Sequence, residues 1–453
     1  MTLPNFFLAD LPPEASLTPT LVREACQTLK RNREQHLATR PTAHVIKVLS
    51  DLAANWIEPD YPLRRVALAQ GPEAAGFPAA TLARGLDAFF GQLTREHLQA
   101  WVQQELGHAQ RLDGLAATEP ETRRLQAAMA RGPELLVHIA AGNVPSPAWM
   151  SMVSGLLVRS AQFVKCARGA SLLPRLFAHS LHEAEPKLAA CLEIAEWPGG
   201  EAPLEEPLFE EASCVTVTGS NETLAELRGR LPLRVRFLGY GHRVSFGFVA
   251  QEALGGYGVD RWIKRAAEDV VAWNQQGCLS PHLFYVQSGG SMSAEGFAEA
   301  LAAEMARLET VEPRGPLPVA ESAGIASRRE FYQVRAAASR RTRLWCSEGS
   351  TAWTVVYEED PLFQLSCLNR FVYVKGVADL AEALREAEPV REHISTVGVA
   401  AAEGDAEELA LSLARWGVRR VCPLGRMQHP PLSWRHDGRP GLADLVTWTD
   451  WER

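Results

Sequence analysis

The sequence lacks the cysteine patterns of metal sites and disulfide scaffolds. Its eight cysteines, at positions 26, 166, 191, 214, 278, 346, 367 and 422, include no CxxC pair and no cluster with histidine at the spacing of zinc ligands. Structural zinc and a disulfide framework are therefore disfavoured, and reduced thiols in a cytoplasm fit best. The first residues also lack the basic region of a signal peptide, and Asp10 interrupts their apolar stretch.

An excess of positive charge is also missing. Against 46 Lys and Arg there are 54 Asp and Glu, which gives a formal net charge of −8. No broad basic field is left to hold a phosphate backbone, so nucleic acid is disfavoured as a partner and small-molecule chemistry is favoured. The 453 residues, 46% hydrophobic and 22% charged, indicate two or three globular domains without long disorder. No repeat of fixed period occurs, which argues against a solenoid.

Long charge-free runs are rare, and the one at residues 135–158 is long enough to span a bilayer. Gly142, Asn143, Pro145 and Pro147 would break a spanning helix there, where lipid cannot satisfy the freed backbone groups. We therefore predict a strand, a loop and a buried helix, and no membrane span.

The periodicity of the chain changes near Gly132. Before it, residues 18–125 are helical in pattern, with Thr18 as a cap and Pro19 at the first helical position. After it, short β-rich runs alternate with helical or glycine-bearing segments, which predicts βαβ units and a largely parallel sheet. These runs are 135–140, 162–165, 214–218 and 234–238. A second α/β section follows, with helices at 258–273, 294–308, 380–386 and 406–416, strands at 283–286 and 371–374, and a mixed region at 317–349.

The most informative local sequence surrounds Cys278. It reads AWNQQGCLSPH from Ala272 to His282 and lies between a predicted helix and a predicted strand. A thiol on a polar loop beside glycine, where backbone N–H groups can point toward it, is placed for nucleophilic attack on an acyl carbon. The competing interpretation is a small buried hydrophobe, which is the commonest role of a free cysteine.

Three further segments follow predicted strands. Asn143 lies in a Gly-Asn turn, where its side-chain N–H could stabilise an oxyanion, although Gly-Asn is also a common turn pair. Lys165 ends the FVK strand, with Arg168 three residues later, and nucleotides bind at the carboxyl ends of strands in open α/β sheets. Thr218–Ser220 precede a helix whose first N–H groups can receive a phosphate, although neither GxGxxG nor a P-loop is present.

Taken in order, these residues resemble the aldehyde dehydrogenase superfamily, and more closely the fatty acyl-CoA reductases of bacterial luminescence. The likeness runs from about Gly132 to the carboxyl terminus and is sharpest in HIAAGNVP, FVK, VTGSNETL, GYGHRVSFG, NQQGCLSPH and WRHDG. It implies an aldehyde dehydrogenase-like α/β fold with two doubly wound, Rossmann-like domains. The expected parts are a helical region at 1–130, an NAD(P)-binding domain at 131–255, a catalytic domain at 256–425 and an oligomerisation tail at 426–453.

The resemblance also implies roles for the site residues. Cys278 would be the nucleophile, and Asn143 with the Cys278 backbone N–H would form the oxyanion hole. Lys165 would contact the adenosine ribose, and Gly219 and Ser220 would lie near the cofactor phosphates at a helix start. A carboxylate on the nicotinamide ribose is expected well after the nucleophile, with Glu358 or Glu359 as the nearest candidate. His242, His282 and the segment His436-Asp437-Gly438 receive no role.

Two departures from the superfamily pattern refine the expected activity. In hydrolytic aldehyde dehydrogenases a glutamate two residues before a Gly-Gly pair activates the deacylating water, whereas residues 237–242, FLGYGH, contain no carboxylate. Water attack on an acyl-enzyme should therefore be slow. Arg168 stands where NAD-preferring relatives often carry an acidic residue, and an arginine can pair with a 2′-phosphate. NADPH is the expected cofactor.

We therefore expect NADPH-dependent reduction of an acyl-CoA or acyl-carrier thioester to an aldehyde, through an acyl-enzyme on Cys278. The chain length of the acyl group stays open, as does its delivery by an acyl-activating or acyl-transferring partner protein. One alternative is reduction of another activated acyl group, as in γ-glutamyl phosphate reductases, with Arg340, Arg341 and Arg343 as a cationic clamp. Others are a cysteine acyltransferase or thioesterase without redox chemistry, and an assembly subunit without turnover. The resemblance also implies a homo-oligomer.

Overall fold

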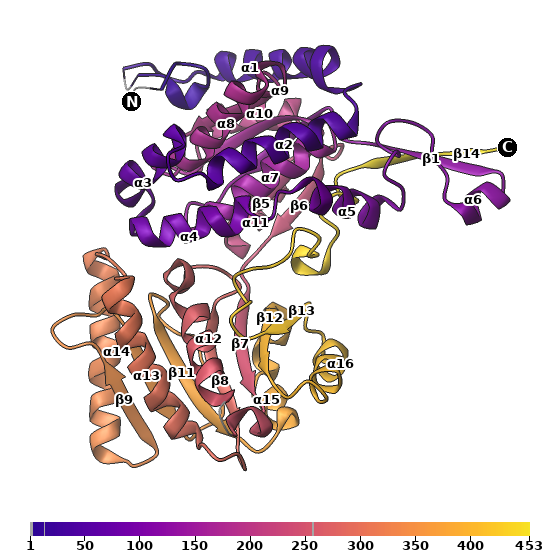
Figure 1. Ribbon diagram of the computed structural model, residues 1–453. Coiled ribbons are helices and arrows are strands. Elements are labelled where there is room, and N and C mark those ends of the chain that lie inside the picture. Colours follow the sequence, from indigo (N-terminus) through magenta and orange to yellow (C-terminus); the bar gives the residue numbers. More distant parts are fainter. Residues whose placement is uncertain (1–2, 13, 256–257) are drawn as a thin grey trace. The chain divides into compact units, whose positions relative to one another are not determined.

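The chain folds into two compact units in a computed structural model that describes residues 3–12, 14–255 and 258–453 (Figure 1). The first unit consists of Met1–Ala75, Leu82–Gly241 and Pro431–Arg453. The second unit consists of Gly76–Thr81 and His242–Pro430. Each unit is built around its own sheet.

The sheet of the first unit has five parallel strands in the order β4-β3-β2-β5-β6. Their bounds are β2 Leu135–Ile139, β3 Ala161–Cys166, β4 Leu192–Glu196, β5 Cys214–Thr218 and β6 Arg236–Tyr240. Apolar runs form these strands because helices cover both faces of the sheet. The four strand predictions in this region are confirmed, the last with a shift of two residues.

Helices of the first unit lie on both faces of this sheet. On one face α1 and α10 pack their apolar sides against β2 and β3, and on the other α2 and α8 pack with α7. As predicted, Thr18 caps α1, since its hydroxyl accepts a hydrogen bond of 3.2 Å from the Leu21 N–H, and Pro19 follows it. The bounds are α1 Pro19–Asn32, α2 Thr42–Ile57, α3 Pro62–Ala75, α4 Ala79–Phe90, α5 Arg95–Leu106, α6 Glu119–Arg123, α7 Ser146–Leu157, α8 Leu172–Ala184, α9 Pro186–Ala189, α10 Ala202–Glu211 and α11 Asn221–Arg230.

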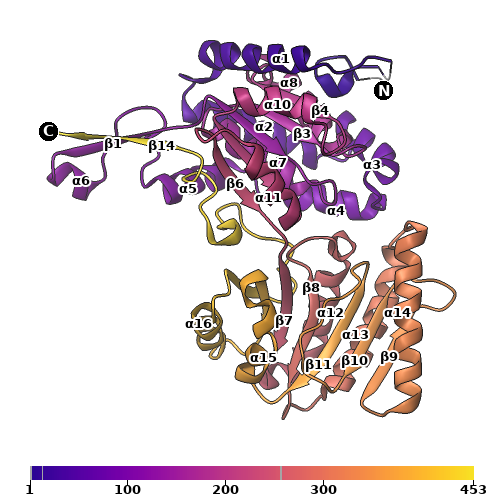
Figure 2. The ribbon, with the colours of Figure 1, turned by 180° about the vertical axis from the view of Figure 1, so that it is seen from behind.

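A two-stranded antiparallel ribbon extends from the first unit, as both views show (Figures 1 and 2). It pairs β1 (Gln126–Arg131) with β14 (Thr447–Glu452), so that segments more than 300 residues apart in sequence lie side by side. Every residue of β14 is exposed, and Trp448 and Trp451 keep 40% and 42% of their surface open. The ribbon thus presents aromatic surface outside the core.

The sheet of the second unit has seven strands in the order β13-β12-β7-β8-β11-β10-β9, all parallel except the antiparallel edge strand β9. Side chains of α12 and α13 fill the core on one face, and those of α14, α15 and α16 on the other. The strands are β7 Val244–Val249, β8 Pro281–Gln287, β9 Thr342–Cys346, β10 Thr354–Glu358, β11 Phe371–Val377, β12 Ile394–Ala400 and β13 Arg420–Pro423. The helices are α12 Val259–Val271, α13 Ala294–Val311, α14 Val319–Ala338, α15 Leu380–Glu386 and α16 Ala406–Trp416.

One region differs from the sequence expectation. Residues 317–349, predicted as mixed, contain the 20-residue helix α14. Its buried residues are only Ile325, Arg329 and Tyr332, so the apolar periodicity that marks a helix in sequence is weak there. The stretch 135–158 does form a strand, a loop and a buried helix, as predicted. Among the described residues, no helix is both long and apolar enough to cross a membrane.

Candidate active site

The predicted cofactor residues gather at the carboxyl edge of the first unit's sheet. Asn143 follows β2, Lys165 and Arg168 lie at and after the end of β3, and Thr218–Ser220 follow β5. From β2 the chain proceeds outward through β3 and β4 on one side and through β5 and β6 on the other. The strand order therefore reverses at β2, and open α/β sheets bind nucleotides at the carboxyl ends beside such a reversal.

Lys165 is a buried lysine with few partners. Only 4% of its surface is exposed, and its ammonium lies 5.9 Å from the centroid of the Trp197 ring. Burial lowers the pKa of Lys165, and the nearby Glu205 and Glu196 oppose that shift. Within the described residues its ammonium makes no hydrogen bond and no ion pair. Because buried polar groups normally have a partner, this position fits a group that binds a ligand such as a ribose.

The loops that carry Arg168 and Ser220 are held by local hydrogen bonds. The Glu196 carboxylate, at the end of β4, accepts hydrogen bonds from the backbone N–H groups of Gly169 (2.7 Å) and Ser171 (3.2 Å) and so fixes the loop that exposes Arg168. The Ser220 hydroxyl accepts a hydrogen bond from the Thr223 N–H at 3.2 Å and caps α11.

The Asn143 loop packs directly against the Arg168 loop. A Cβ atom on Gly142 would lie 3.3 Å and 3.4 Å from the Cβ atoms of Ala167 and Ala170, which is tight contact. Asn143 itself is exposed. The structure thus brings the predicted oxyanion residue and the predicted cofactor residues to one edge of the first unit.

Cys278 lies in the second unit, in a turn just before β8. The Ser280 N–H donates to the Gly277 carbonyl at 2.9 Å to close this turn, and the Ser245 hydroxyl donates to the Cys278 carbonyl at 2.9 Å. The thiol is half-buried. Burial raises the pKa of five other cysteines to about 12; these are Cys26, Cys166, Cys191, Cys214 and Cys422. The first four are buried, which suits small hydrophobes.

Two left-handed backbone segments flank the Cys278 turn, and the sequence analysis did not find them. Residues 273–275 have φ angles of 51°, 49° and 65°, and residues 368–370 have φ angles of 57°, 55° and 65°. The Gln276 amide donates to the Asn369 side chain at 2.7 Å, and the Arg370 guanidinium donates to the Asn274 side chain at 3.0 Å. Non-glycine residues in this region are strained and concentrate at functional sites. The only sequence signal was the density of Asn and Gln beside Cys278.

The histidines that received no role have structural partners. The His282 Nδ1 accepts a hydrogen bond from the Ser366 N–H at 3.1 Å, and burial lowers the pKa of His282 to about 4. His282 is therefore neutral at neutral pH, with its proton on Nε2. In the first unit the His436 ring stacks on Tyr240, with 4.6 Å between centroids, which places the WRHDG segment against the end of β6.

Glu358 and Glu359 lie at the wrong end of β10 for a role beside Cys278. Glu358, the last residue of β10, lies beside Lys375 of β11, which in turn lies beside Tyr285 of β8. Tyr285 is four residues after Pro281, the first residue of β8. That separation corresponds to about 13 Å along the strands. The two carboxylates therefore lie at the edge of the sheet opposite the Cys278 turn.

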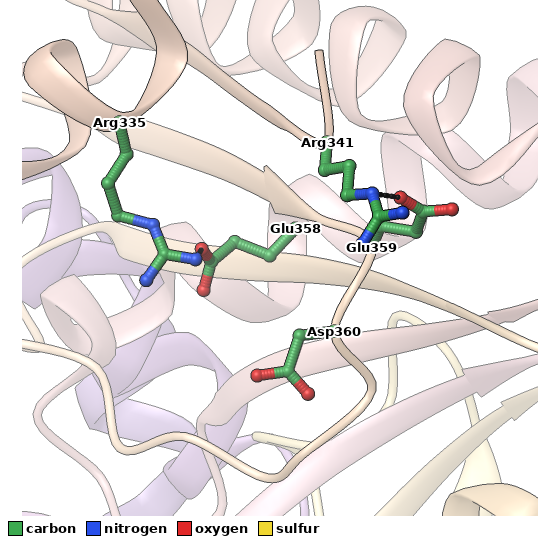
Figure 3. A pocket seen from close by; sticks show the side chains of 5 residues that line it. All are labelled: Arg335, Arg341, Glu358, Glu359 and Asp360. Carbon is green, nitrogen blue, oxygen red and sulfur yellow. Dashed lines mark ion pairs between the residues drawn. The ribbon is translucent and has the colours of Figure 1, made fainter. Parts of the chain in front are cut away.

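A pocket of about 240 Å³ surrounds these two carboxylates (Figure 3). Arg335 pairs with the buried Glu358 at 2.9 Å, and Arg341 pairs with Glu359 at 3.1 Å, as Figure 3 shows. The pocket is lined by Arg335, Arg341, Glu358, Glu359 and Asp360. The guanidinium groups are already neutralised by carboxylates, so the pocket is not a cationic clamp.

The other arginines suggested for a clamp are placed no better. Arg343, on the edge strand β9, pairs with Glu295 at 2.8 Å, and Arg340 is exposed just before that strand. The clamp expected for a small anionic acyl substrate has no support in this arrangement.

Solved structures share the fold over nearly the whole chain. An NAD-dependent benzaldehyde dehydrogenase from Corynebacterium glutamicum is 13% identical, with a TM-score of 0.70 over 99% of this chain and 94% of that one. The glyceraldehyde-3-phosphate dehydrogenase GapN from Methanocaldococcus jannaschii, complexed with NADP, is 12% identical, with a TM-score of 0.70 over 96% and 95%. The predicted aldehyde dehydrogenase-like α/β fold is therefore confirmed.

Curated relatives are more specific about chemistry. The long-chain acyl-protein thioester reductase of Aliivibrio fischeri is 23% identical over 326 residues, and that of Vibrio harveyi is 22% identical over 328 residues. Each match covers 70% of this chain but 64% of the relative, so the chain matches less than two thirds of their length. A family model described as acyl-CoA reductase (LuxC) matches residues 37–448. The predicted resemblance is confirmed, and the chain belongs to the LuxC family of acyl-CoA reductases, which are oxidoreductases.

Proposed function

We propose that this chain reduces a fatty acyl thioester to an aldehyde, with NADPH as reductant and Cys278 as nucleophile. The observation that carries the proposal is the half-buried Cys278 thiol on a fixed turn, in a chain of the acyl-CoA reductase family. The first unit adds an edge suited to a dinucleotide. NADPH is favoured over NADH because Arg168 is a cation where a 2′-phosphate would lie.

The chemistry begins at the thiol. The Cys278 thiolate attacks the thioester carbonyl carbon, and the oxyanion accepts a hydrogen bond from the Cys278 backbone N–H. The family resemblance assigns the Asn143 amide as the second donor. The carbon–sulfur bond to CoA then breaks, CoA leaves as a thiolate that takes a proton from solvent, and the acyl group stays on Cys278. The Ser245 hydroxyl, bonded to the Cys278 carbonyl, keeps the turn in place during this exchange.

The family resemblance assigns the cofactor site to residues of the first unit. Lys165 would hold the ribose, Arg168 the 2′-phosphate, and Gly219 and Ser220 at the start of α11 the phosphates. NADPH, when bound, supplies the hydride that reduces the acyl carbon. The bond between Cys278 and that carbon then breaks, which frees the aldehyde and restores the thiolate.

Two features protect or complete this cycle. Residues 237–242 supply no carboxylate to activate water, so the acyl group on Cys278 survives until it is reduced. We infer that the carboxylate for the nicotinamide ribose comes from the edge of the sheet where Cys278 lies. Glu348 is exposed in the loop between β9 and β10 at that edge, because Cys346 pairs with Thr354 at the first residue of β10.

We also infer that the chain forms a homo-oligomer through the β1–β14 ribbon. Trp448 and Trp451 expose aromatic surface there, and such residues are enriched at interfaces. Replacing both by serine should lower the molecular mass measured by light scattering.

The test is NADPH oxidation with acyl-CoAs from acetyl to palmitoyl, for the wild type, Cys278→Ala and Cys346→Ala. Cys346 is also half-buried in the second unit and serves as the matched control. We expect aldehyde from the wild type and from Cys346→Ala, and none from Cys278→Ala. Release of CoA without NADPH oxidation would instead indicate acyl transfer or thioester hydrolysis.

A further inference from the structure

A loop that follows β13 is held by a buried aspartate and a buried arginine. Asp269, on α12, is 1% exposed, and its carboxylate accepts hydrogen bonds from the N–H groups of Gly425 (2.6 Å) and Met427 (2.9 Å). Arg420, in β13, donates to the carbonyls of Met427 and Arg426, both at 2.7 Å. Four hydrogen bonds thus fix the backbone of residues 425–427, and we call Asp269 and Arg420 the clamp.

The charges of the clamp and of Cys278 influence one another. Burial raises the pKa of Asp269 to about 7, and the N–H groups of Gly425 and Met427 and the charge of Arg420 oppose that shift. Burial lowers the pKa of Arg420, while the charges of Cys422, Asp269 and Cys278 raise it. The clamp and the nucleophile therefore share one electrostatic environment within the second unit.

Gln428, the residue after the clamped segment, contacts both ends of the Cys278 turn. Its amide donates to the Ser280 hydroxyl. Its other side lies over Gly277, where a Cβ atom would be 2.8 Å from the Gln428 Oε1 and 3.3 Å from the Nε2. Gly277 and Ser280 are the residues that close the turn through their own backbone hydrogen bond.

We propose that Gln428 is a positioning residue for Cys278, held in place by the Asp269–Arg420 clamp. By fixing Gly277 and Ser280, Gln428 fixes the direction of the Cys278 thiol and of the Cys278 backbone N–H. The inference rests on the proposed role of Cys278 as nucleophile. The thiol and the oxyanion donor share one turn, so a shift of that turn changes the orientation of both toward the substrate. A displacement of about 1 Å can lower the rate about 100-fold.

The experiment uses the full chain with Gln428→Met, Gln428→Glu and, as matched control, Gln333→Met on the exposed face of α14. Methionine keeps the volume and loses the hydrogen bond, whereas glutamate keeps the shape and adds a negative charge beside the turn. The measurements are kcat, KM for NADPH, and the pH profile of iodoacetamide alkylation mapped to the Cys278 peptide. Thermal unfolding shows that each variant is folded, since the loop backbone is held by the clamp rather than by the Gln428 side chain.

We expect Gln428→Met to lower kcat by about 10-fold with an unchanged KM for NADPH. Gln428→Glu should shift the alkylation profile of Cys278 upward by about one pH unit, because a negative charge beside the turn disfavours the thiolate. The inference is overturned if both variants match Gln333→Met in kcat and in alkylation. Failure of the proposed function is a separate result, namely aldehyde formation by Cys278→Ala.

Discussion

Reversing the charge of Arg168 should change which nicotinamide cofactor the protein prefers. In the proposed site the guanidinium pairs with the 2′-phosphate of NADPH, and hydrogen bonds to charged groups contribute about 1.5–3 kcal/mol. Since Arg168 is exposed and solvent screens it, the lower value applies. Glutamate would add a repulsion of about 1 kcal/mol at 4 Å in water. The sum of about 2.5 kcal/mol corresponds to a 50- to 100-fold loss in kcat/KM for NADPH.

The assay compares kcat/KM for NADPH with kcat/KM for NADH at saturating acyl-CoA. Arg168→Glu should lower the first and leave the second within about 3-fold, since NADH has no 2′-phosphate. Arg124→Glu, a charge reversal at another exposed arginine, after α6, should change neither. An unchanged NADPH-to-NADH ratio in Arg168→Glu would refute the assignment of the 2′-phosphate to this loop.

Three further predictions concern the oxyanion donor, a packed glycine and a buried histidine. Asn143→Ala should lower kcat by about 100- to 1,000-fold and leave KM for NADPH unchanged in steady-state assays. Gly132→Ala should destabilise the first unit by about 1–3 kcal/mol in denaturant unfolding, because its Cβ would lie within 2.1 Å of the Val158 carbonyl oxygen. Burial lowers the pKa of His138 to about 4, so the wild type should lose about 2 kcal/mol more stability than His138→Gln between pH 7 and pH 5.

The sign of the histidine effect follows from proton binding. In the unfolded chain His138 has its ordinary pKa of 6.5 and takes up a proton between pH 7 and pH 5. In the folded chain it stays neutral over that range, so acid favours unfolding. Half-buried Glu193 and buried Asp269 act in the opposite direction, because their pKa values are raised to about 8 and about 7. The comparison with His138→Gln removes their contribution. Equal pH dependence of the two proteins would contradict the assignment.

Local sequence was sufficient to predict the elements whose residues are nearly all buried. The strands β2, β3 and β5 are continuous apolar runs that end in turn residues, and they lie where predicted. Helix α14 was missed because it buries few of its residues. The ribbon of β1 and β14 joins segments more than 300 residues apart, and no local pattern encodes that pairing.

The same distinction applies to the candidate site. Asn143, Lys165 and Cys278 stand out because each sits beside a recognisable strand end. Glu358 was suggested from its place in the chain order, which does not reveal at which end of a strand a residue lies. Gln428 could not be found from sequence, because its contacts with the Cys278 turn span about 150 residues and depend on the fold of the second unit.

The most direct test of the account is to trap the acyl group on the protein. The wild type is incubated without NADPH, with the acyl-CoA that gives the fastest turnover, and its peptides are examined by mass spectrometry. The account predicts one thioester-linked acyl group on the Cys278 peptide, which disappears on addition of NADPH as aldehyde forms. An unmodified Cys278 peptide, or an acyl group on Cys278 that NADPH does not discharge, would contradict it.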